Sequence, residues 1–327
     1  MKNLIIYILF IIIFFQKIFN IKEKSMMKNN DNKKILANQT GYTENIPSEY
    51  FKEANHKGKI TKIKYPSKDY LRGNRSITKE AYVYTPYGYN DNDINKKYNI
   101  IYLMHGWKMT TEHYIFKCDI INVLDNMIEK KLIEPLILVS ATFDADNKPQ
   151  DFGLSVKELR VFHNDFRENL IYAVEKKYNT YSNRSKNIQD YINSREHRAF
   201  GGFSLGSVTT WHQFVFNNDI IKYYLPMSGS CWFFGGYADY YPKETCDFFE
   251  KMIKEKNLNQ KGYFIFATTG TYDGIKHQMD TQMEEMLKRN NFFTKDKVVY
   301  YMKKNGLHDL EAVEEYLYNA LPLFFND

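Results

Sequence analysis

The chain has 327 residues, of which 43% are hydrophobic and 17% aromatic, and its formal net charge is +6. This length fits one large domain or two small ones, and the hydrophobic content is sufficient for a globular core. Basic residues are scattered and no run of five like charges occurs, so the composition argues against a nucleic-acid-binding protein.

The N-terminus has the pattern of an export signal. After Lys2, residues 4–15 carry no polar side chain apart from the Tyr7 hydroxyl. This run matches the apolar region of a signal peptide and is short for a membrane span. We predict a signal peptide over residues 1–21 and a secreted, extracellular protein without stable membrane association. No A-x-A cleavage site is visible, so an uncleaved signal anchor stays open.

The remaining chain is predicted to hold a polar leader and one domain. Residues 22–45 are rich in Lys and Asn and read as a linker, and residues 46–327 form a single predicted domain. In chain order, strand-like runs lie at 58–65, 79–84, 98–104, 136–143, 197–203, 263–268 and 298–302. Helix-like runs lie at 116–131, 156–178, 207–216 and 309–325.

This alternation of strands and helices predicts an α/β fold. Strands that alternate with helices form βαβ units, hence a mainly parallel central sheet with helices on both faces. The runs at 58–65 and 79–84 have no helix between them, and we expect them to form an antiparallel edge. Functional sites in such sheets lie beyond the carboxyl ends of the strands.

A nucleophile is predicted at the turn after the strand at 197–203. Residues 202–206 read Gly-Phe-Ser-Leu-Gly, the G-x-S-x-G pattern in which a serine sits on a sharp strand-to-helix turn. This pattern predicts Ser204 as the nucleophile of a serine hydrolase. Five letters match by chance too easily to stand alone, so a base, an acid and an oxyanion hole must follow in the right order.

The base and the acid are predicted in loops that follow the last two strands. His308 comes after the strand at 298–302, and Asp273 comes after the strand at 263–268, which gives the order serine, acid, histidine. Asp280 and Asp309 are rivals for the acid. We expect Asp280 to lie within the next helix and Asp309 to cap the final one.

The oxyanion hole needs two backbone N–H donors. One is expected from Leu205, directly after the nucleophile. The second is expected from the loop after the strand at 98–104, which reads Met-His-Gly-Trp over residues 104–107. Trp107 is the predicted second donor, and His105 is expected to hold the loop rather than to act in catalysis.

Taken together, these motifs resemble the feruloyl esterases of carbohydrate esterase family one, which are esterase-D-like α/β-hydrolases of plant-fibre degraders. The resemblance runs from about residue 46 to 325. It rests on AYVYTPYGY (81–89), YNIIYLMHG (98–106), LDNMIEKKLIEPLILVSATF (124–143), DFRENLIYAVEKKYNTY (165–181), HRAFGGFSLGSVTTW (197–211), LPMSGSCW (225–232) and GLHDLEAV (306–313).

The resemblance implies an α/β-hydrolase fold and a Ser204, Asp273 and His308 triad. Two departures concern the rim of the site: Trp107-Lys108-Met109 replaces the family's glycine-rich loop, and Glu311 stands where an aromatic residue is usual. No dockerin or carbohydrate-binding module is seen in this sequence.

We therefore expect a serine esterase that hydrolyses feruloyl esters of arabinoxylan, or small hydroxycinnamate esters, through an acyl-enzyme and without a metal or cofactor. Trp107, Trp232 and Phe233 are the predicted wall for the phenolic ring, and residues 228–246 are predicted to loop over the site. An acetylxylan or general short-chain esterase with the same triad remains an alternative, as does an inactive carbohydrate-binding module.

The cysteines leave a further question open. Of Cys118, Cys231 and Cys246, the last two are nearest in sequence and could form a disulfide in an exported chain. Free buried thiols are an equal alternative. Asn-x-Ser/Thr sequences, which matter only where the host glycosylates, begin at residues 38, 74 and 183.

Overall fold

The computed structural model describes residues 42–43, 45–234 and 241–326. The predicted signal peptide, nearly all of the predicted leader and residues 235–240 lie outside the described residues. No helix in the described ranges combines the length and apolar character that crossing a bilayer requires.

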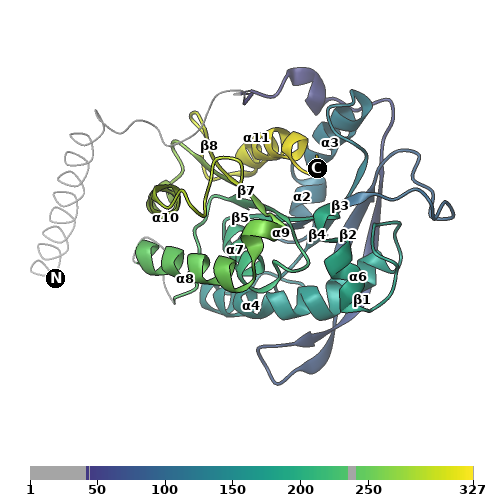
Figure 1. The fold of residues 1–327 in the computed structure, drawn as a ribbon. Helices are drawn as coiled ribbons and strands as arrows, with labels where there is room; N and C mark the ends of the chain where they lie inside the picture. The colour runs from purple at the N-terminus through teal and green to yellow at the C-terminus, as the bar shows by residue number, and fades with distance from the viewer. Residues whose placement is uncertain (1–41, 44, 235–240, 327) are drawn as a thin grey trace, which may run out of the picture. The chain divides into compact units, whose positions relative to one another are not determined.

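One eight-stranded sheet organises the fold, with the strand order β1-β2-β4-β3-β5-β6-β7-β8 (Figure 1). β1 and β2 form an antiparallel hairpin, β2 also pairs antiparallel with β4, and all other neighbours are parallel. The predicted mainly parallel sheet and its antiparallel edge are thus confirmed. The strands are Lys59–Asp69, Arg75–Thr85, Asn99–Met104, Leu136–Ala141, Arg198–Phe203, Tyr223–Met227, Phe264–Gly270 and Val298–Lys303.

Helices cover both faces of this sheet, as predicted (Figure 1). Residues of α4, α5, α7, α8 and α10 join one hydrophobic cluster, and residues of α2, α3 and α11 join a second one on the other face. The helices are α2 His113–Phe116, α3 Ile120–Glu129, α4 Phe152–Asp165, α5 Ile171–Glu175, α6 Ile188–Asn193, α7 Leu205–Phe216, α8 Pro242–Glu255, α9 Leu258–Lys261, α10 Lys276–Lys288 and α11 Leu310–Ala320. Short irregular helices are η1 Ser48–Phe51, η2 Phe166–Leu170, η3 Arg195–His197 and η4 Leu321–Leu323.

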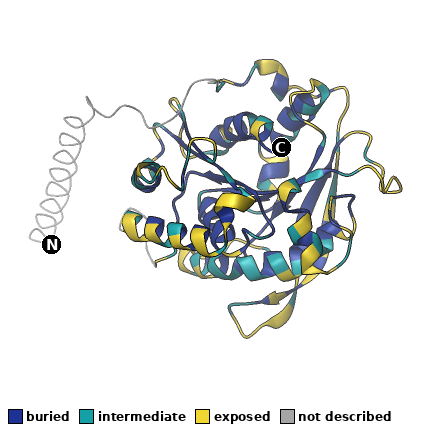
Figure 2. Cartoon of the chain, in the orientation of Figure 1, coloured by how far each residue is buried: buried dark blue, intermediate teal, exposed yellow. Residues whose placement is uncertain are grey.

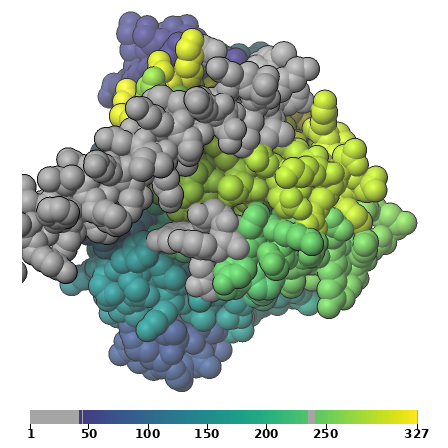
Figure 3. Space-filling model, turned by 90° about the vertical axis from the view of Figure 1, so that its left-hand side faces the viewer, coloured from purple at the N-terminus to yellow at the C-terminus, as the bar shows by residue number. Residues whose placement is uncertain are grey.

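The burial pattern follows from this layering. The central strands β3, β4, β5 and β6 are buried almost throughout, while α4 and α8 expose their outer faces (Figure 2). Continuous apolar strands are expected when helices cover both faces of a parallel sheet. Figure 3 shows α8 and α10 as adjoining green and yellow-green surfaces on one side of the molecule.

Several predicted boundaries change in the structure. The helix predicted over 116–131 is α2 followed by α3, with a break at 117–119. The helix predicted over 156–178 starts earlier, because the Asp151 side chain caps it by accepting the N–H of Leu154 at 3.1 Å, and it ends at Glu175. Of the loop predicted over 228–246, residues 242–246 belong to α8, which begins at Pro242, and residues 235–240 lie outside the described residues. β6 was not predicted, since a five-residue strand containing Pro226 carries a weak signal.

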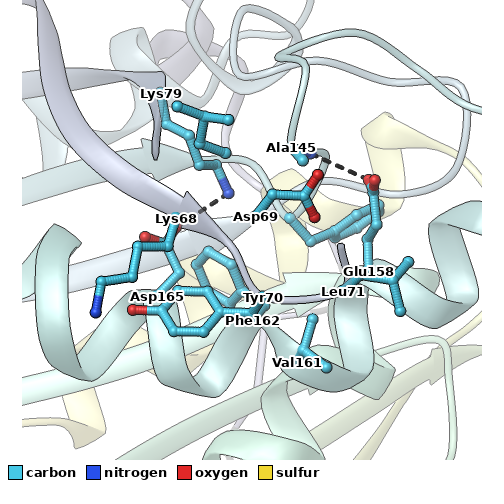
Figure 4. A pocket seen from close by; sticks show the side chains of 12 residues that line it. Lys68, Asp69, Tyr70, Leu71, Lys79, Ala145, Glu158, Val161, Phe162 and Asp165 are labelled. Atoms are coloured by element: carbon cyan, nitrogen blue, oxygen red, sulfur yellow. Dashed lines mark hydrogen bonds and ion pairs between the residues drawn. The ribbon is translucent and has the colours of Figure 1, made fainter. Parts of the chain in front are cut away.

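Buried polar side chains tie the hairpin to the rest of the sheet. Lys79 of β2 pairs with Asp165 at 3.0 Å and also donates to the carbonyl of Thr142 at 2.6 Å. Figure 4 shows the Lys79–Asp165 pair, with Glu158 accepting the N–H of Ala145 beside it. Removing one partner of such a buried pair costs about 3–5 kcal/mol. The cluster therefore fixes the segment after β4, which also contacts the candidate site.

Candidate active site

Ser204 occupies a strained turn between β5 and α7. Its backbone has φ 58° and ψ −117°, a left-handed conformation that costs a non-glycine residue about 1–3 kcal/mol. The Ser204 N–H donates to the carbonyl of Met227 at 2.9 Å, which fixes the turn to the end of β6. The side chain is partly exposed. This is the geometry expected of a nucleophile at a G-x-S-x-G turn.

The two glycines of the motif permit close backbone contacts. A Cβ atom on Gly206 would lie 2.0 Å from the carbonyl oxygen of Met104. A Cβ atom on Gly202 would lie 2.5 Å from the backbone of Gly206. Since no side chain fits at either position, the turn can close against β3 only with glycine there.

The loop after β3 lies directly against this turn. A Cβ atom on Gly106 would lie 3.1 Å from the Cβ atom of Ser204, and Trp107 is the next residue. Leu205 is the first residue of α7, where backbone N–H groups have no acceptor within the helix and carry its partial positive charge. The structure therefore brings together the two segments from which the oxyanion donors Leu205 and Trp107 were predicted.

His105 connects that loop to the segment after β4. Its Nδ1 lies 2.8 Å from the carbonyl oxygen of Gly106, and its Nε2 lies 2.8 Å from the hydroxyl of Thr142. Donation from Nδ1 leaves Nε2 to accept the Thr142 proton, which is the neutral tautomer. Burial lowers the pKa of His105 to about 4, so the ring is neutral at physiological pH. Its contacts fit the expected loop-holding role.

Asp273 and His308 meet at the ends of β7 and β8. The Nδ1 atom of His308 lies 2.9 Å and 3.1 Å from the two carboxyl oxygens of Asp273. Their loops are joined by the Tyr272 N–H, which donates to the Gly306 carbonyl at 2.9 Å. A Cβ atom on Gly270 would lie 2.2 Å from that same carbonyl oxygen. The glycine thus allows the approach that pairs the acid with the histidine.

The Asp273 carboxyl is ionised at neutral pH. Burial raises its pKa, but the hydrogen bond and charge of His308, the N–H of Ile275 and the nearby Ser228 hydroxyl together lower it below its ordinary value. A carboxylate that accepts from Nδ1 leaves Nε2 of His308 as the proton acceptor. The His308 ring also packs 4.5 Å from the ring of Phe203, the residue immediately before Ser204.

Ser228 and Tyr316 surround the acid and were not predicted from the sequence. Ser228 follows β6 directly, is fully buried and has φ 56°. Tyr316 projects from α11 and is also fully buried; burial raises its pKa, which the Ser228 hydroxyl partly offsets and Asp273 reinforces. The sequence Met-Ser-Gly-Ser over residues 227–230 indicated a loop after the strand. Only the packing of α11 against this loop shows which side chains lie near Asp273.

The two rival carboxylates have other partners. Asp280 lies in α10, as expected, where it pairs with Lys276 and accepts the hydroxyl of Tyr300 at 2.8 Å. Asp309 caps α11, also as expected, by accepting the N–H of Ala312 at 2.9 Å. Neither side chain is arranged to hold His308.

A row of aromatic rings begins at Trp107, in the loop after β3. The Trp107 ring lies 5.1 Å from that of Phe152, which lies 6.3 Å from that of Trp232. The indole N–H of Trp107 donates to the carbonyl of Gln150 at 3.0 Å. Phe152, the first residue of α4, was not predicted. The predicted Phe233 belongs to a second aromatic group, where it stacks on Phe248 of α8 at 4.5 Å.

All three cysteines are free thiols in the structure. Both Cys231 and Cys246 contact Gln282: its side-chain oxygen accepts the N–H of Cys231 at 2.6 Å, and its carbonyl oxygen lies 4.0 Å from Sγ of Cys246. Burial raises the pKa of both thiols to about 12, so they are unreactive at neutral pH. Within the described ranges no group of three or more His, Cys, Asp or Glu side chains is placed to hold a metal ion.

Known proteins share this sequence and fold. No family model matches the chain. Endo-1,4-beta-xylanase Y of Acetivibrio thermocellus is 35% identical over 288 residues, or 86% of this chain, which spans about a quarter (24%) of the xylanase. A serine-to-alanine mutant of the feruloyl esterase module from Clostridium thermocellum, complexed with sinapinate, has a TM-score of 0.74 and 33% identity, and the match covers 86% of this chain and 93% of that one.

A more distant structure shares the fold alone. The ferulic acid esterase of carbohydrate esterase family one from Anaeromyces mucronatus has 19% identity and a TM-score of 0.64, with 87% of this chain and 97% of that one covered. The fold and these relatives define the protein as an α/β-hydrolase that acts as a carboxylic ester hydrolase. More narrowly, the chain belongs to the feruloyl esterases.

Proposed function

We propose that the protein hydrolyses feruloyl and related hydroxycinnamoyl esters of plant cell-wall arabinoxylan. The observation that carries this proposal is the hydrogen-bonded Asp273–His308 pair next to the Ser204 turn. The relative solved with sinapinate, a hydroxycinnamate, supports the acyl class. The relative named as a xylanase supports a xylan chain as the alcohol part of the ester.

In the proposed acylation step, Ser204 attacks the ester carbonyl carbon. Nε2 of His308 accepts the serine proton, and Asp273 stabilises the resulting imidazolium. The backbone N–H groups of Leu205 and Trp107 donate to the oxyanion that develops on the carbonyl oxygen. The ester C–O bond then breaks, and the sugar oxygen leaves with the proton from His308.

Deacylation repeats these steps with water as the nucleophile. Water attacks the acyl carbon and gives its proton to His308, while the same N–H donors hold the second oxyanion. The bond between the acyl carbon and Oγ of Ser204 breaks, and the serine recovers its proton from His308. Ferulate leaves as a free acid, and the enzyme returns to its starting state.

The row formed by Trp107, Phe152 and Trp232 suits a planar phenolic acyl group. Aromatic rings pack favourably against one another in offset or edge-on arrangements, and the three rings extend from the loop that supplies the proposed oxyanion donor. An acetyl group would leave such a row without a partner. The aromatic row therefore favours a hydroxycinnamoyl ester over an acetyl ester.

Export of the chain completes the proposal. A polysaccharide substrate is too large to enter a cell, and residues 4–15 have the apolar character of a signal sequence. Fractionation of a producing culture, with detection of the protein in the medium or on the cells, tests export separately from the chemistry.

A substrate panel tests the acyl class. The purified protein is assayed on methyl ferulate, p-nitrophenyl acetate and acetylated xylan, and ferulate release is measured from feruloylated arabinoxylan. We expect turnover of methyl ferulate and of the feruloylated polysaccharide, with little release of acetate from acetylated xylan. Cleavage of the acetyl substrates without any turnover of methyl ferulate would contradict the proposal and favour the short-chain esterase.

A further inference from the structure

A second hollow lies at the opposite end of the sheet from the candidate site. It has a volume of about 380 Å³ and lies between the turn after β2 and the segment after α5. Because β2 runs antiparallel to β4, the end of β2 at Thr85 lies near the amino ends of the parallel strands. We call this hollow the tyrosine groove, after Tyr87, Tyr89 and Tyr178, which help to line it.

One wall of the groove is a tight turn that presents an aromatic ring. The Tyr89 N–H donates to the carbonyl of Pro86 at 3.0 Å, and Gly88 has φ 73°. A positive φ at the third position defines a type II turn, which glycine permits. The turn leaves Tyr87 59% exposed, and the ring is supported on one side by His56 at 4.4 Å.

The same wall is anchored, so the groove is present before any ligand binds. The backbone N–H of Asn179 donates to the Tyr89 hydroxyl at 2.9 Å. The Asn179 side chain donates to the carbonyls of Asn90 and Asp93, each at 2.9 Å. A preformed concave site loses little conformational freedom on binding.

The floor of the groove is a buried tyrosine. Tyr178 is 5% exposed and lines the groove. Burial raises the pKa of its hydroxyl, which the neighbouring Thr61 side chain partly offsets. Thr61 also lines the groove, so the floor is fixed by packing before any ligand binds.

The charge of the lining is positive. Its charged side chains are three lysines, Lys57, Lys59 and Lys177, and Asp91. Lys57 pairs with Glu53 at 2.6 Å. Lys59 and Lys177 make no ion pair with any of the residues that the structure describes. The lysines outnumber the single aspartate, and this excess of positive charge favours an anionic ligand.

We propose that the tyrosine groove is a second, non-catalytic binding site for a sugar chain that carries carboxylate groups, such as a uronate-substituted xylan. The Tyr87 ring provides a flat apolar surface for the C–H face of a pyranose ring, and Lys59 and Lys177 bind the carboxylate. The choice of xylan rests on the proposed function. Binding one chain at two places raises the effective concentration of its esters at the active site.

Binding measurements with matched variants test the groove. The purified protein is titrated by calorimetry with a glucuronate-substituted xylo-oligosaccharide and with a neutral one of equal length. We expect Tyr87→Ala to weaken binding of both by about 10-fold or more, since an exposed stacking ring is lost. Tyr181→Ala is the control, because Tyr181 is also an exposed tyrosine, 42% accessible, and stacks on His197 at 3.4 Å outside the groove.

The lysines provide the second arm of the test. We expect Lys59→Ala and Lys177→Ala to reduce affinity for the uronate-substituted ligand toward that of the neutral one, and added salt to do the same in the parent. Equal affinities of the parent, Tyr87→Ala and Tyr181→Ala would overturn the proposal, as would the absence of binding by the parent.

Turnover of soluble methyl ferulate separates this proposal from the proposed function. This ester is too small to reach both sites, so its rate reports the active site alone. Normal turnover without oligosaccharide binding would overturn only the groove proposal. Oligosaccharide binding that depends on Tyr87, without turnover of methyl ferulate, would overturn only the proposed acyl specificity.

Discussion

The two ends of the sheet are built in different ways. At the carboxyl end, the turns after β5 and β6 place non-glycine residues, Ser204 and Ser228, at φ 58° and 56°. At the amino end, the turn beside the tyrosine groove takes its positive φ at Gly88, where it costs nothing. The turn that holds the proposed nucleophile therefore carries backbone strain that the Tyr87 turn avoids, as is common at functional sites.

This contrast implies different tolerance to substitution. The carboxyl end depends on close backbone contacts and on buried groups with shifted pKa values, so single changes there should be severe. The amino end presents exposed rings and lysines on an anchored turn, so changes there should alter ligand binding and little else. Each of the following changes tests one part of the carboxyl end against a matched position.

The largest expected effect concerns the acid. We expect Asp273→Asn to reduce kcat on methyl ferulate by about 10⁴-fold, because the amide no longer fixes the reactive tautomer of His308. Asp280→Asn is the control, since Asp280 lies in α10 and bonds to Tyr300, and its rate should stay within about 3-fold of the parent. If the two variants lose activity equally, Asp273 is not the catalytic acid.

The next effect concerns the Ser204 turn. We expect Gly206→Ala to lower the free energy of unfolding by about 3 kcal/mol or more, because the new methyl group would overlap the carbonyl of Met104. Gly153→Ala in α4 meets only Asp151 Oδ1 at 3.4 Å and should change stability by no more than about 1 kcal/mol. Urea unfolding of both variants measures the difference, and equal midpoints would contradict the close contact at Gly206.

A third effect depends on pH. Burial, followed by the charge of Glu158, raises the pKa of Asp144 to about 7 from its ordinary value of 3.8. Between these values the folded protein keeps a proton that the unfolded chain releases. The ionisation of Asp144 should therefore lower the free energy of unfolding as the pH rises from about 4 to about 7, by about 1.4 kcal/mol per pH unit at most.

Asp144→Asn removes this dependence, since the amide does not titrate. We expect the stability of the variant relative to the parent to increase across that pH range, as measured by thermal unfolding at several pH values. Glu158, whose pKa is also raised by burial, keeps its own contribution in both proteins. Parallel curves for the parent and the variant would show that Asp144 is ionised in the folded state.

The smallest effect concerns the aromatic row. We expect Phe152→Ala to raise KM for methyl ferulate by about 10-fold, which corresponds to the loss of one aromatic contact, and to leave p-nitrophenyl acetate turnover nearly unchanged. Phe216→Ala is the control, because Phe216 is exposed to the same degree, 37% against 38%, and stacks on His163 instead. Equal effects of the two variants on methyl ferulate would remove Phe152 from the proposed acyl site.

The sequence predicted much of the fold because its central strands are continuous apolar runs, such as residues 99–104 and 136–141. The Ser204 turn and the Asp273–His308 pair follow from a motif and from chain order, so both could be predicted from the sequence alone. β6 was missed because Pro226 and its short length weaken the strand signal.

The supporting residues could not be predicted in the same way. Ser228 and Tyr316 are 88 positions apart in numbering and meet near Asp273 only through the packing of α11. Phe152 lies between two predicted tryptophans, but a phenylalanine at a helix start reads as ordinary packing. Tertiary packing, which a single sequence does not encode locally, brings these side chains to the candidate site.

The central claim is that Ser204 performs acyl transfer with the help of His308 and Asp273. The most direct test is the initial rate on methyl ferulate of the purified protein beside its Ser204→Ala variant, with thermal unfolding to confirm that both are folded. The account predicts that the variant loses about 10⁴-fold or more in rate, since catalysis depends on the serine as nucleophile. A folded Ser204→Ala protein that keeps a rate within about 10-fold of the parent would contradict it.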